Sequence, residues 1–242
     1  MDILLFVFVA ALSLKSFVSA FDVTNFPTWE EYIQSPGPYN GKIVGGQEAD
    51  IEDHPYQVSF IVNNQYFCGG FIVSENYILT AAHCAQDVDP STVVLRAGSS
   101  YRKNGTIIPI AEVTPHPEYD NPQFDKDVAV MKTVDPIPLN NDTIMAIPLP
   151  LVGRPISGGT KIIQGASSIP ERLMDVEIPV VYYYPCFFVY PTGDSGGAAI
   201  QDGVAVGIVS FGRGCGQRLS PSVFADIAAE PIREFIRNIT GL

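Results

Sequence analysis

Short runs of β-branched and aromatic residues, separated by turn-forming residues, recur along most of the chain. They cover residues 56–61, 69–73, 77–80, 92–96, 106–108, 128–131, 176–182, 198–200, 204–209 and 223–227. Two of these runs are joined through Asp202-Gly203, a pair typical of hairpin turns. Many short strands with turn signals between them predict an all-β protein built as a sandwich or a barrel.

The two ends of the chain have different patterns. Residues 3–12 are apolar and lead to Val18-Ser19-Ala20, which predicts a signal peptide cleaved after Ala20. An uncleaved anchor is the alternative, but this apolar run is too short to span a bilayer. At the other end, apolar residues recur with the period of a helix, which predicts an amphipathic C-terminal helix: Ile232, Phe235, Ile236 and Ile239.

Residues 21–42 are rich in proline and glycine and have no sustained period, which predicts a propeptide rather than a domain. The remaining residues, 43–242, are numerous enough to form one compact domain. The chain has a net charge of −12. This acidic balance argues against nucleic acid and anionic membranes as partners.

A signal peptide directs the protein to a compartment where disulfides form. Cys68 and Cys84 bracket two predicted strands, and a bridge between them would fix the loop that carries His83. Three tripeptides are candidate N-glycosylation sites, and each of them is also short enough to have arisen by chance: they begin at Asn104, Asn141 and Asn238.

Three separate motifs carry the candidate chemistry. They are Thr80-Ala81-Ala82-His83-Cys84, Asp127-Val128-Ala129-Val130 and Gly193-Asp194-Ser195-Gly196-Gly197. Together they supply an imidazole base, a carboxylate that orients the base, and a hydroxyl nucleophile. A glycine-rich segment alone can also be a tight turn, but the three motifs in this order favour acyl transfer. The other histidines, His54 and His116, each precede a proline and are interpreted as solvated loop residues.

With these motifs and Ile43-Val44-Gly45-Gly46, the chain resembles the trypsin/chymotrypsin-type (S1) serine proteases, which are secreted as zymogens. The resemblance implies two six-stranded antiparallel β-barrels with the active site between them. It implies the catalytic residues His83, Asp127 and Ser195 and the Cys68–Cys84 disulfide. It also implies a protein or peptide substrate, protein inhibitors, and neither a cofactor nor a metal.

The resemblance assigns further roles in and around the catalytic site. The N–H groups of Gly193 and Ser195 would form the oxyanion hole, and Ser210 would donate a hydrogen bond to Asp127. A Lys/Arg-specific protease would cleave between Lys42 and Ile43. The new amine of Ile43 would then pair with Asp194, because a buried ammonium needs a buried anion.

The sequence departs from the family pattern before the nucleophile. Only six residues separate Cys186 from Gly193, where the family has a longer stretch with two more cysteines. Cys186 and Cys215 therefore lack their usual partners and either bond to each other or remain free thiols. The Gly-Trp-Gly motif expected near residue 165 is also missing.

The remaining specificity-pocket positions indicate an apolar P1 residue. Val189 stands where trypsin-like members place an acid, and a buried valine cannot compensate a lysine or arginine. Gly212 matches one glycine of the pocket wall, while Ser222 replaces the other. Alternatively, Tyr190 or Ser222 plugs the pocket.

Three interpretations of the whole chain follow from these observations. The first is an active secreted endopeptidase with a chymotrypsin-like or elastase-like preference. The second is a catalytically weak or silent homologue that binds a partner. In the third, residues are missing from the sequence near Gly165 and after Cys186.

Overall fold

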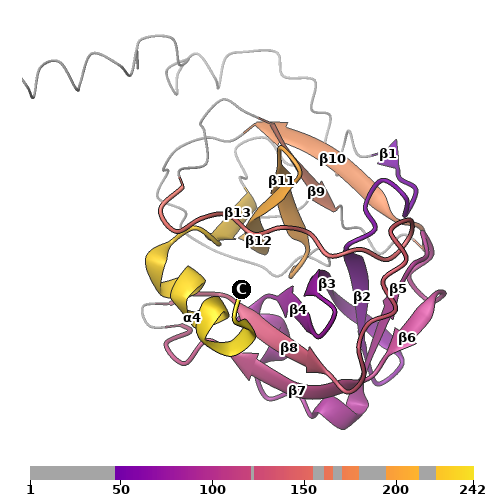
Figure 1. Ribbon diagram of the computed structural model, residues 1–242, viewed down its shortest axis with the longest axis horizontal. Coiled ribbons are helices and arrows are strands. Elements are labelled where there is room, and N and C mark those ends of the chain that lie inside the picture. Colours follow the sequence, from indigo (N-terminus) through magenta and orange to yellow (C-terminus); the bar gives the residue numbers. More distant parts are fainter. Residues whose placement is uncertain (1–46, 121–122, 155–160, 166–170, 180–194, 213–221) are drawn as a thin grey trace, which may run out of the picture. The chain divides into compact units, whose positions relative to one another are not determined.

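A computed structural model describes residues 47–120, 123–154, 161–165, 171–179, 195–212 and 222–242. The predicted signal peptide and propeptide, and the activation residues Lys42 and Ile43, lie outside the described residues. Within the described part of the chain, no helix is both long and apolar enough to cross a membrane. Two antiparallel sheets and a C-terminal helix account for most of the described structure (Figure 1).

The first sheet has the order β6-β5-β2-β3-β4-β8-β7. Its strands are β2 (Gln57–Val62), β3 (Gln65–Ser74), β4 (Tyr77–Thr80), β5 (Val93–Ala97), β6 (Thr106–Ile108), β7 (Ile110–Pro115) and β8 (Ala129–Thr133). Alternate residues of β5 are buried, as expected for a strand with one face on a core, and β2 departs from this alternation only at the register shift between Phe60 and Ile61.

This sheet closes on itself at Pro109. β6 and β7, the two ends of the strand order, are one continuous segment interrupted only by that residue. A proline has no N–H to donate to a ladder, so the strand breaks there while the Pro109 carbonyl accepts from Val134 N at 3.0 Å. β6 pairs with β5 and β7 pairs with β8, which gives the six-stranded barrel that the family resemblance implies.

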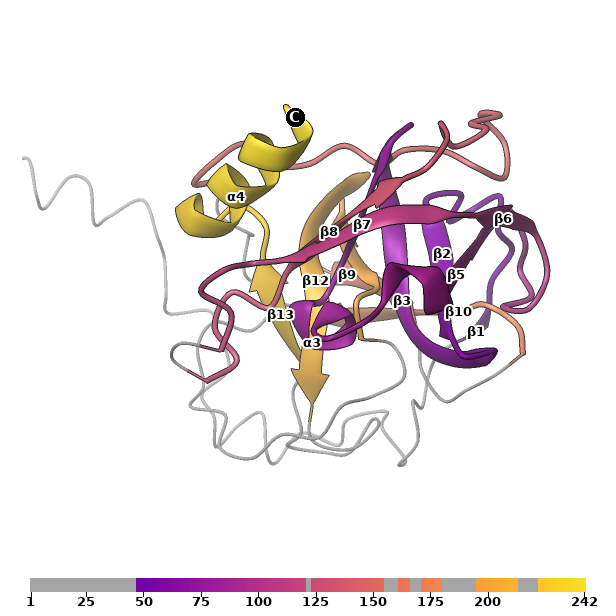
Figure 2. The same ribbon diagram turned by 90° about the horizontal axis from the view of Figure 1, so that it is seen from below.

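The second sheet has the order β1-β10-β9-β11-β12-β13. Its strands are β1 (Gln47–Glu48), β9 (Lys161–Gly165), β10 (Met174–Pro179), β11 (Ala198–Gln201), β12 (Val204–Gly212) and β13 (Ser222–Asp226). β11 and β12 form the hairpin predicted at Asp202-Gly203, where both residues have positive φ. The short helix α3 (Ala82–Ala85) follows β4 of the first sheet. Figure 2 shows it near β12 and β13 of the second sheet.

The C-terminal helix α4 (Glu230–Thr240) confirms the predicted amphipathic pattern. Ile232 and Ile236 are buried, and Phe235 and Ile239 pack against the core. Gly241 ends the helix in the left-handed conformation, with its N–H bound to the Arg237 carbonyl. The helix therefore docks through one apolar face.

The interpretation of His54 and His116 as solvated residues was wrong. Each is only 7% exposed. The ring of His54 contacts the Tyr56 hydroxyl at 2.8 Å and Asp175 Oδ2 at 3.2 Å. The ring of His116 packs on Phe235 of α4, with 4.7 Å between the ring centroids. A following proline restricts the backbone but does not determine whether the side chain is buried.

His116 is held as a neutral ring with a defined tautomer. Its Nδ1 accepts from the Glu118 N–H at 3.1 Å, so the proton lies on Nε2. Burial is the main cause that lowers the pKa of His116 below its ordinary value, although a hydrogen bond to the Pro231 carbonyl raises it. Protonation would therefore break the bond that Nδ1 accepts from the Glu118 N–H and would place a charge on a buried ring.

We expect stability to fall in acid through His116. With a lowered folded pKa, the unfolded chain binds more protons than the native one as the pH falls below about 6.5. The stability is present above that pH and is lost as the pH falls through the folded pKa. Urea unfolding at several pH values between about 5 and 8 should give a shallower pH dependence for His116→Gln than for the parent. Equal slopes would contradict the assignment.

Candidate active site

His83 lies on α3, directly after β4. The Cys68–Cys84 disulfide, predicted from the sequence, joins this helix to β3 with an S–S distance of 2.05 Å. Both cysteines are buried, whereas the His83 side chain is 22% exposed. The disulfide therefore fixes the backbone of the candidate base while its ring reaches the surface.

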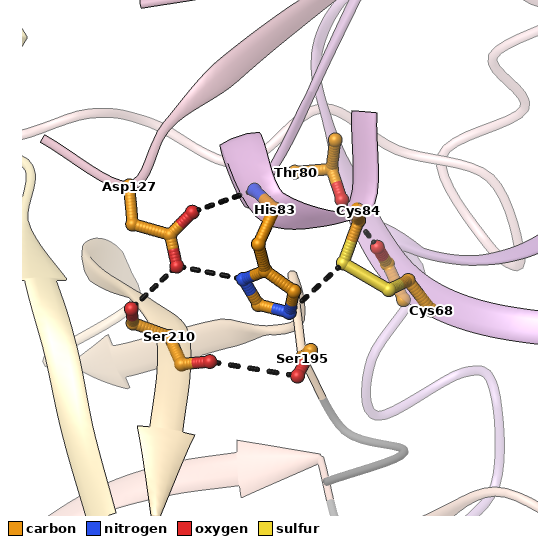
Figure 3. The surroundings of a disulfide bond; sticks show 8 residues. Cys68, Thr80, His83, Cys84, Asp127, Ser195 and Ser210 are labelled. Atoms are coloured by element: carbon orange, nitrogen blue, oxygen red, sulfur yellow. Dashed lines mark hydrogen bonds and ion pairs between the residues drawn. A yellow bond between two sulfur atoms is a disulfide. The ribbon is translucent and has the colours of Figure 1, made fainter. Parts of the chain in front are cut away.

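Asp127 lies just before β8 and is only 1% exposed. Its Oδ1 accepts from the backbone N–H of His83 at 2.9 Å, and its Oδ2 lies 2.7 Å from His83 Nδ1. Ser210 Oγ, from β12 of the second sheet, donates to the same Oδ2 (Figure 3). A carboxylate can only accept, so Nδ1 carries a proton and the neutral ring has its lone pair on Nε2. This is the tautomer that a general base requires.

Ser195 is the first described residue after the gap at 180–194, and it is 1% exposed. Its backbone carbonyl accepts from the Gly69 N–H of β3 at 2.8 Å. Its Oγ donates a long hydrogen bond of 3.5 Å to the Ser210 carbonyl, while His83 Nε2 lies 3.4 Å from Cys84 Sγ. Figure 3 shows Ser195 on the Nε2 side of the His83 ring. Hydrogen bonds between catalytic groups commonly tighten only when substrate binds.

The turn after Ser195 needs glycine. Gly196 has a φ of +82°, and its N–H donates to the Val209 carbonyl at 2.8 Å. A Cβ on Gly196 would clash with Thr80 Oγ1 and with the Gly69 carbonyl, which are hydrogen-bonded to each other at 2.8 Å. Gly196 thus lets the nucleophile's turn approach β3 and β4 closely.

Gly196→Ala should destabilise the protein and lower its activity. The left-handed backbone alone costs a non-glycine residue about 1–3 kcal/mol, and the clash with Thr80 and Gly69 adds to that. Gly203→Ala is the matched control, because Gly203 has a similar φ of +73° but nothing within 4 Å of an added Cβ. Urea unfolding should show a larger loss for Gly196→Ala than for Gly203→Ala, and equal losses would contradict the close approach.

A half-buried tyrosine lies near the triad carboxylate. Burial raises the pKa of Tyr119 to about 12, and the charges of Asp127 and Asp120 contribute to the same shift. Its hydroxyl therefore stays neutral next to Asp127. Neither this tyrosine nor the Gly69 amide was predicted as part of the site, although Gly69-Gly70 beside Cys68 could have indicated a close backbone approach.

Several predicted site residues lie outside the described residues. They are Gly193, Asp194, Val189, Tyr190, Cys186 and Cys215. The backbone is described at Gly212 and Ser222, which are direct partners in the β12–β13 ladder. The two candidate pocket-wall positions are ten residues apart in the sequence and are brought together by the pairing of their strands.

One group of side chains has the composition of a metal site. Ligand atoms of Cys68, His83 and Cys84 lie within 4.8 Å of one another. Two of them are the sulfurs of the disulfide, which offer no thiolate to a metal ion. The group is therefore better explained by the cross-link that supports His83.

Comparisons with known proteins agree with this geometry. A family model for trypsin matches residues 43–236. Trypsin 5G1 of Aedes aegypti is 30% identical over 233 residues, covering 84% of this chain and 86% of the relative. Trypsin Tyr p 3.0101 of Tyrophagus putrescentiae is 34% identical over 222 residues, covering 78% of each.

A solved structure is similar as well. It is the scabies mite inactivated protease paralogue S-D1, with a TM-score of 0.69 and 26% identity, covering 81% of this chain and 97% of that one. This similarity confirms the fold class predicted from the sequence.

Proposed function

The chain belongs to the trypsin family of serine proteases, and we propose that it is made as a secreted zymogen that becomes active after cleavage between Lys42 and Ile43. Its similarity to named trypsins over most of its length makes it a serine endopeptidase. The observation that supports catalysis by this chain is the hydrogen-bonded series Ser210, Asp127 and His83, next to Ser195.

These groups support an acyl-enzyme mechanism. Ser195 Oγ attacks the carbonyl carbon of the scissile bond, and its proton passes to His83 Nε2. Asp127 stabilises the imidazolium through the Nδ1–H bond of 2.7 Å. His83 then returns the proton to the leaving amine, which leaves an acyl group on Ser195. Water hydrolyses that ester by the reverse proton path. The N–H groups of Gly193 and Ser195 are the proposed donors to the oxyanion.

The anchoring of the chain after the activation site supports the zymogen proposal. β1 begins four residues after Ile43 and pairs with Asp175 and Met174 of β10. Arg172 binds Glu48 through Nη1 at 2.9 Å and also pairs with Asp50. A new amine at Ile43 would thus start from a fixed point on the second sheet, from which we propose it reaches Asp194.

We propose an apolar P1 preference. Val189 offers no charge to a lysine or arginine, and Gly212 and Ser222 stand opposite each other as the proposed pocket wall. An uncompensated charge in such a pocket would be costly. Peptides with phenylalanine, leucine or valine at P1 should therefore be cleaved faster than those with lysine or arginine.

An activity-based label tests the whole proposal. The secreted precursor is nicked with trypsin and treated with an organophosphonate that reacts with activated serines. Label at Ser195 should require the nick, and Lys42→Gln should remain unlabelled after trypsin treatment. Labelling of intact precursor would contradict the activation step.

A catalytically weak homologue that binds a partner is the second candidate. One observation favours it: the similar scabies mite structure is that of an inactivated protease paralogue. If Ser195 is not labelled although the nick at Lys42 is complete, this second function is the better one.

A further inference from the structure

The structure holds the backbone of Arg102 in place more firmly than its guanidinium. It lies in the segment between β5 and β6, where its N–H donates to the Glu171 carbonyl at 3.0 Å and its carbonyl accepts from Ser59 Oγ at 2.7 Å. The main chain of Arg102 is therefore tied to the segment before β10 and to β2. Because the backbone is already fixed, binding of a ligand has to order only the side chain of Arg102.

The guanidinium itself has no anionic partner among the residues that the structure describes. Its central carbon lies 5.7 Å from the centroid of the Tyr66 ring. Nε and Nη1 are buried and have no hydrogen-bond partner among the described residues. Arg172, by contrast, pairs with the carboxylates of Glu48 and Asp50. An unpaired guanidinium gains strongly from a carboxylate, and within the described part of the chain neither Nε nor Nη1 has a hydrogen bond to break before Arg102 rotates off the ring to meet one.

The chain segment that carries Arg102 is positive in an acidic protein, although an acidic residue, Glu171, lies against its backbone. The chain carries a net charge of −12, yet no acidic residue occurs between Asp89 and Glu112, a stretch that contains Arg96, Arg102 and Lys103. Lys103 is exposed next to Arg102. This local field would attract a negative group and repel a positive one.

Strand β3 runs from the Arg102 guanidinium to the residues that hold the catalytic groups. Tyr66, beneath the guanidinium, precedes Cys68 and Gly69 on β3. Cys68 is cross-linked to the His83 helix, and Gly69 binds the Ser195 carbonyl. Three residues of strand separate Tyr66 from Gly69, which is about 10 Å. Phe67, between them, is 48% exposed and offers an apolar surface along this path.

We propose that Arg102 and Lys103 form a binding subsite for an acidic side chain of the peptide substrate. The inference rests on the proposed protease function and names a substrate class for it. An extended peptide advances about 3.3 Å per residue, so the acidic side chain would lie roughly three or four residues from the scissile bond. Arg102 would bind the carboxylate with two N–H groups, and Lys103 would add charge.

A peptide series tests the subsite. A single glutamate is moved through the five positions on each side of the scissile bond of a peptide that the nicked enzyme cleaves, with glutamine peptides as references. One position, roughly three or four residues away, should lower KM about tenfold relative to glutamine, the effect of one hydrogen-bonded charge pair. The gain should shrink as salt is raised. In Arg102→Gln it should be lost.

Three variants make the result specific. Lys103→Gln removes an exposed charge with no packing role, so it tests the subsite even if Arg102→Gln unfolds. Arg102→Lys should restore only part of the gain, because lysine lacks the two-pronged geometry. Arg237→Gln, on the exposed face of α4, is the control for loss of one positive charge and should leave the gain unchanged.

Binding separates this proposal from the proposed function. Ser195→Ala cannot turn over peptide, so the dissociation constants of the glutamate and glutamine peptides are measured on it by fluorescence anisotropy. Tighter binding of the glutamate peptide that depends on Arg102 supports the subsite even if the parent proves inactive. Equal binding of the two peptides, or a gain that persists in the Arg102→Gln, Lys103→Gln double variant, overturns it. Binding of a sulfated polysaccharide instead of the acidic peptide also overturns it.

Discussion

Replacing Ser195 with alanine will lower kcat of the nicked enzyme by about 10⁶-fold, the size of loss seen when a serine nucleophile of this kind is removed. Without Oγ there is no atom to form the acyl intermediate, and the hydrogen-bonded pair of His83 and Asp127 has nothing to activate. Single-turnover hydrolysis of a P1-phenylalanine peptide by nicked protein measures the effect.

The fold should survive this change. The contact that places the turn is made by the Ser195 carbonyl with the Gly69 N–H, and alanine keeps that carbonyl. The urea midpoint of Ser195→Ala should therefore match that of the parent. A variant that folds normally and keeps a tenth of the parent's kcat would show that Ser195 is not the nucleophile.

Asp127→Asn should lower kcat by about 10⁴-fold. Asp127 accepts three hydrogen bonds, from the backbone and ring of His83 and from Ser210. An asparagine has only one acceptor oxygen, and its amide would donate to Nδ1. The neutral His83 ring would then carry its proton on Nε2, where it cannot accept the proton of Ser195.

Asp125→Asn is the matched control for this prediction. Asp125 is in the same turn, but its side chain is 45% exposed and pairs with Lys126. Exposed ion pairs of this kind contribute little, so kcat should change by less than about twofold. If the two variants lose similar activity, the loss comes from the turn and not from the orientation of His83.

Most of the strands that the sequence predicted have several β-branched or aromatic residues close together. β7 was not predicted, because its residues Ile110–Pro115 include Ala, Glu and a terminal proline and so form no run of β-branched or aromatic residues. β9 was interpreted only as the place of a missing motif. Both strands form because partners distant in sequence pair with them, β8 with β7 and β10 with β9. A local pattern carries no information about such partners.

The catalytic residues could be predicted because their chemistry depends on side-chain type. His83 and Asp127 lie where the motifs indicated, and Ser210 reaches Asp127 as the family resemblance implied. The contacts that align them could not be predicted, because they use main-chain atoms. Gly69 N–H and the Ser210 carbonyl bind Ser195, and any residue type has those atoms.

Neighbouring positions of β3 hold both reacting groups. Cys68 is covalently linked to the helix of the base, and Gly69 binds the nucleophile's carbonyl. A tilt of one sheet against the other would thus strain the Gly69–Ser195 main-chain hydrogen bond, together with the bond from Ser210 to Asp127, before it separated imidazole from alcohol. The exchange rate of the Gly69 amide proton would consequently report how often the two halves of the machinery come apart, with no need for a substrate.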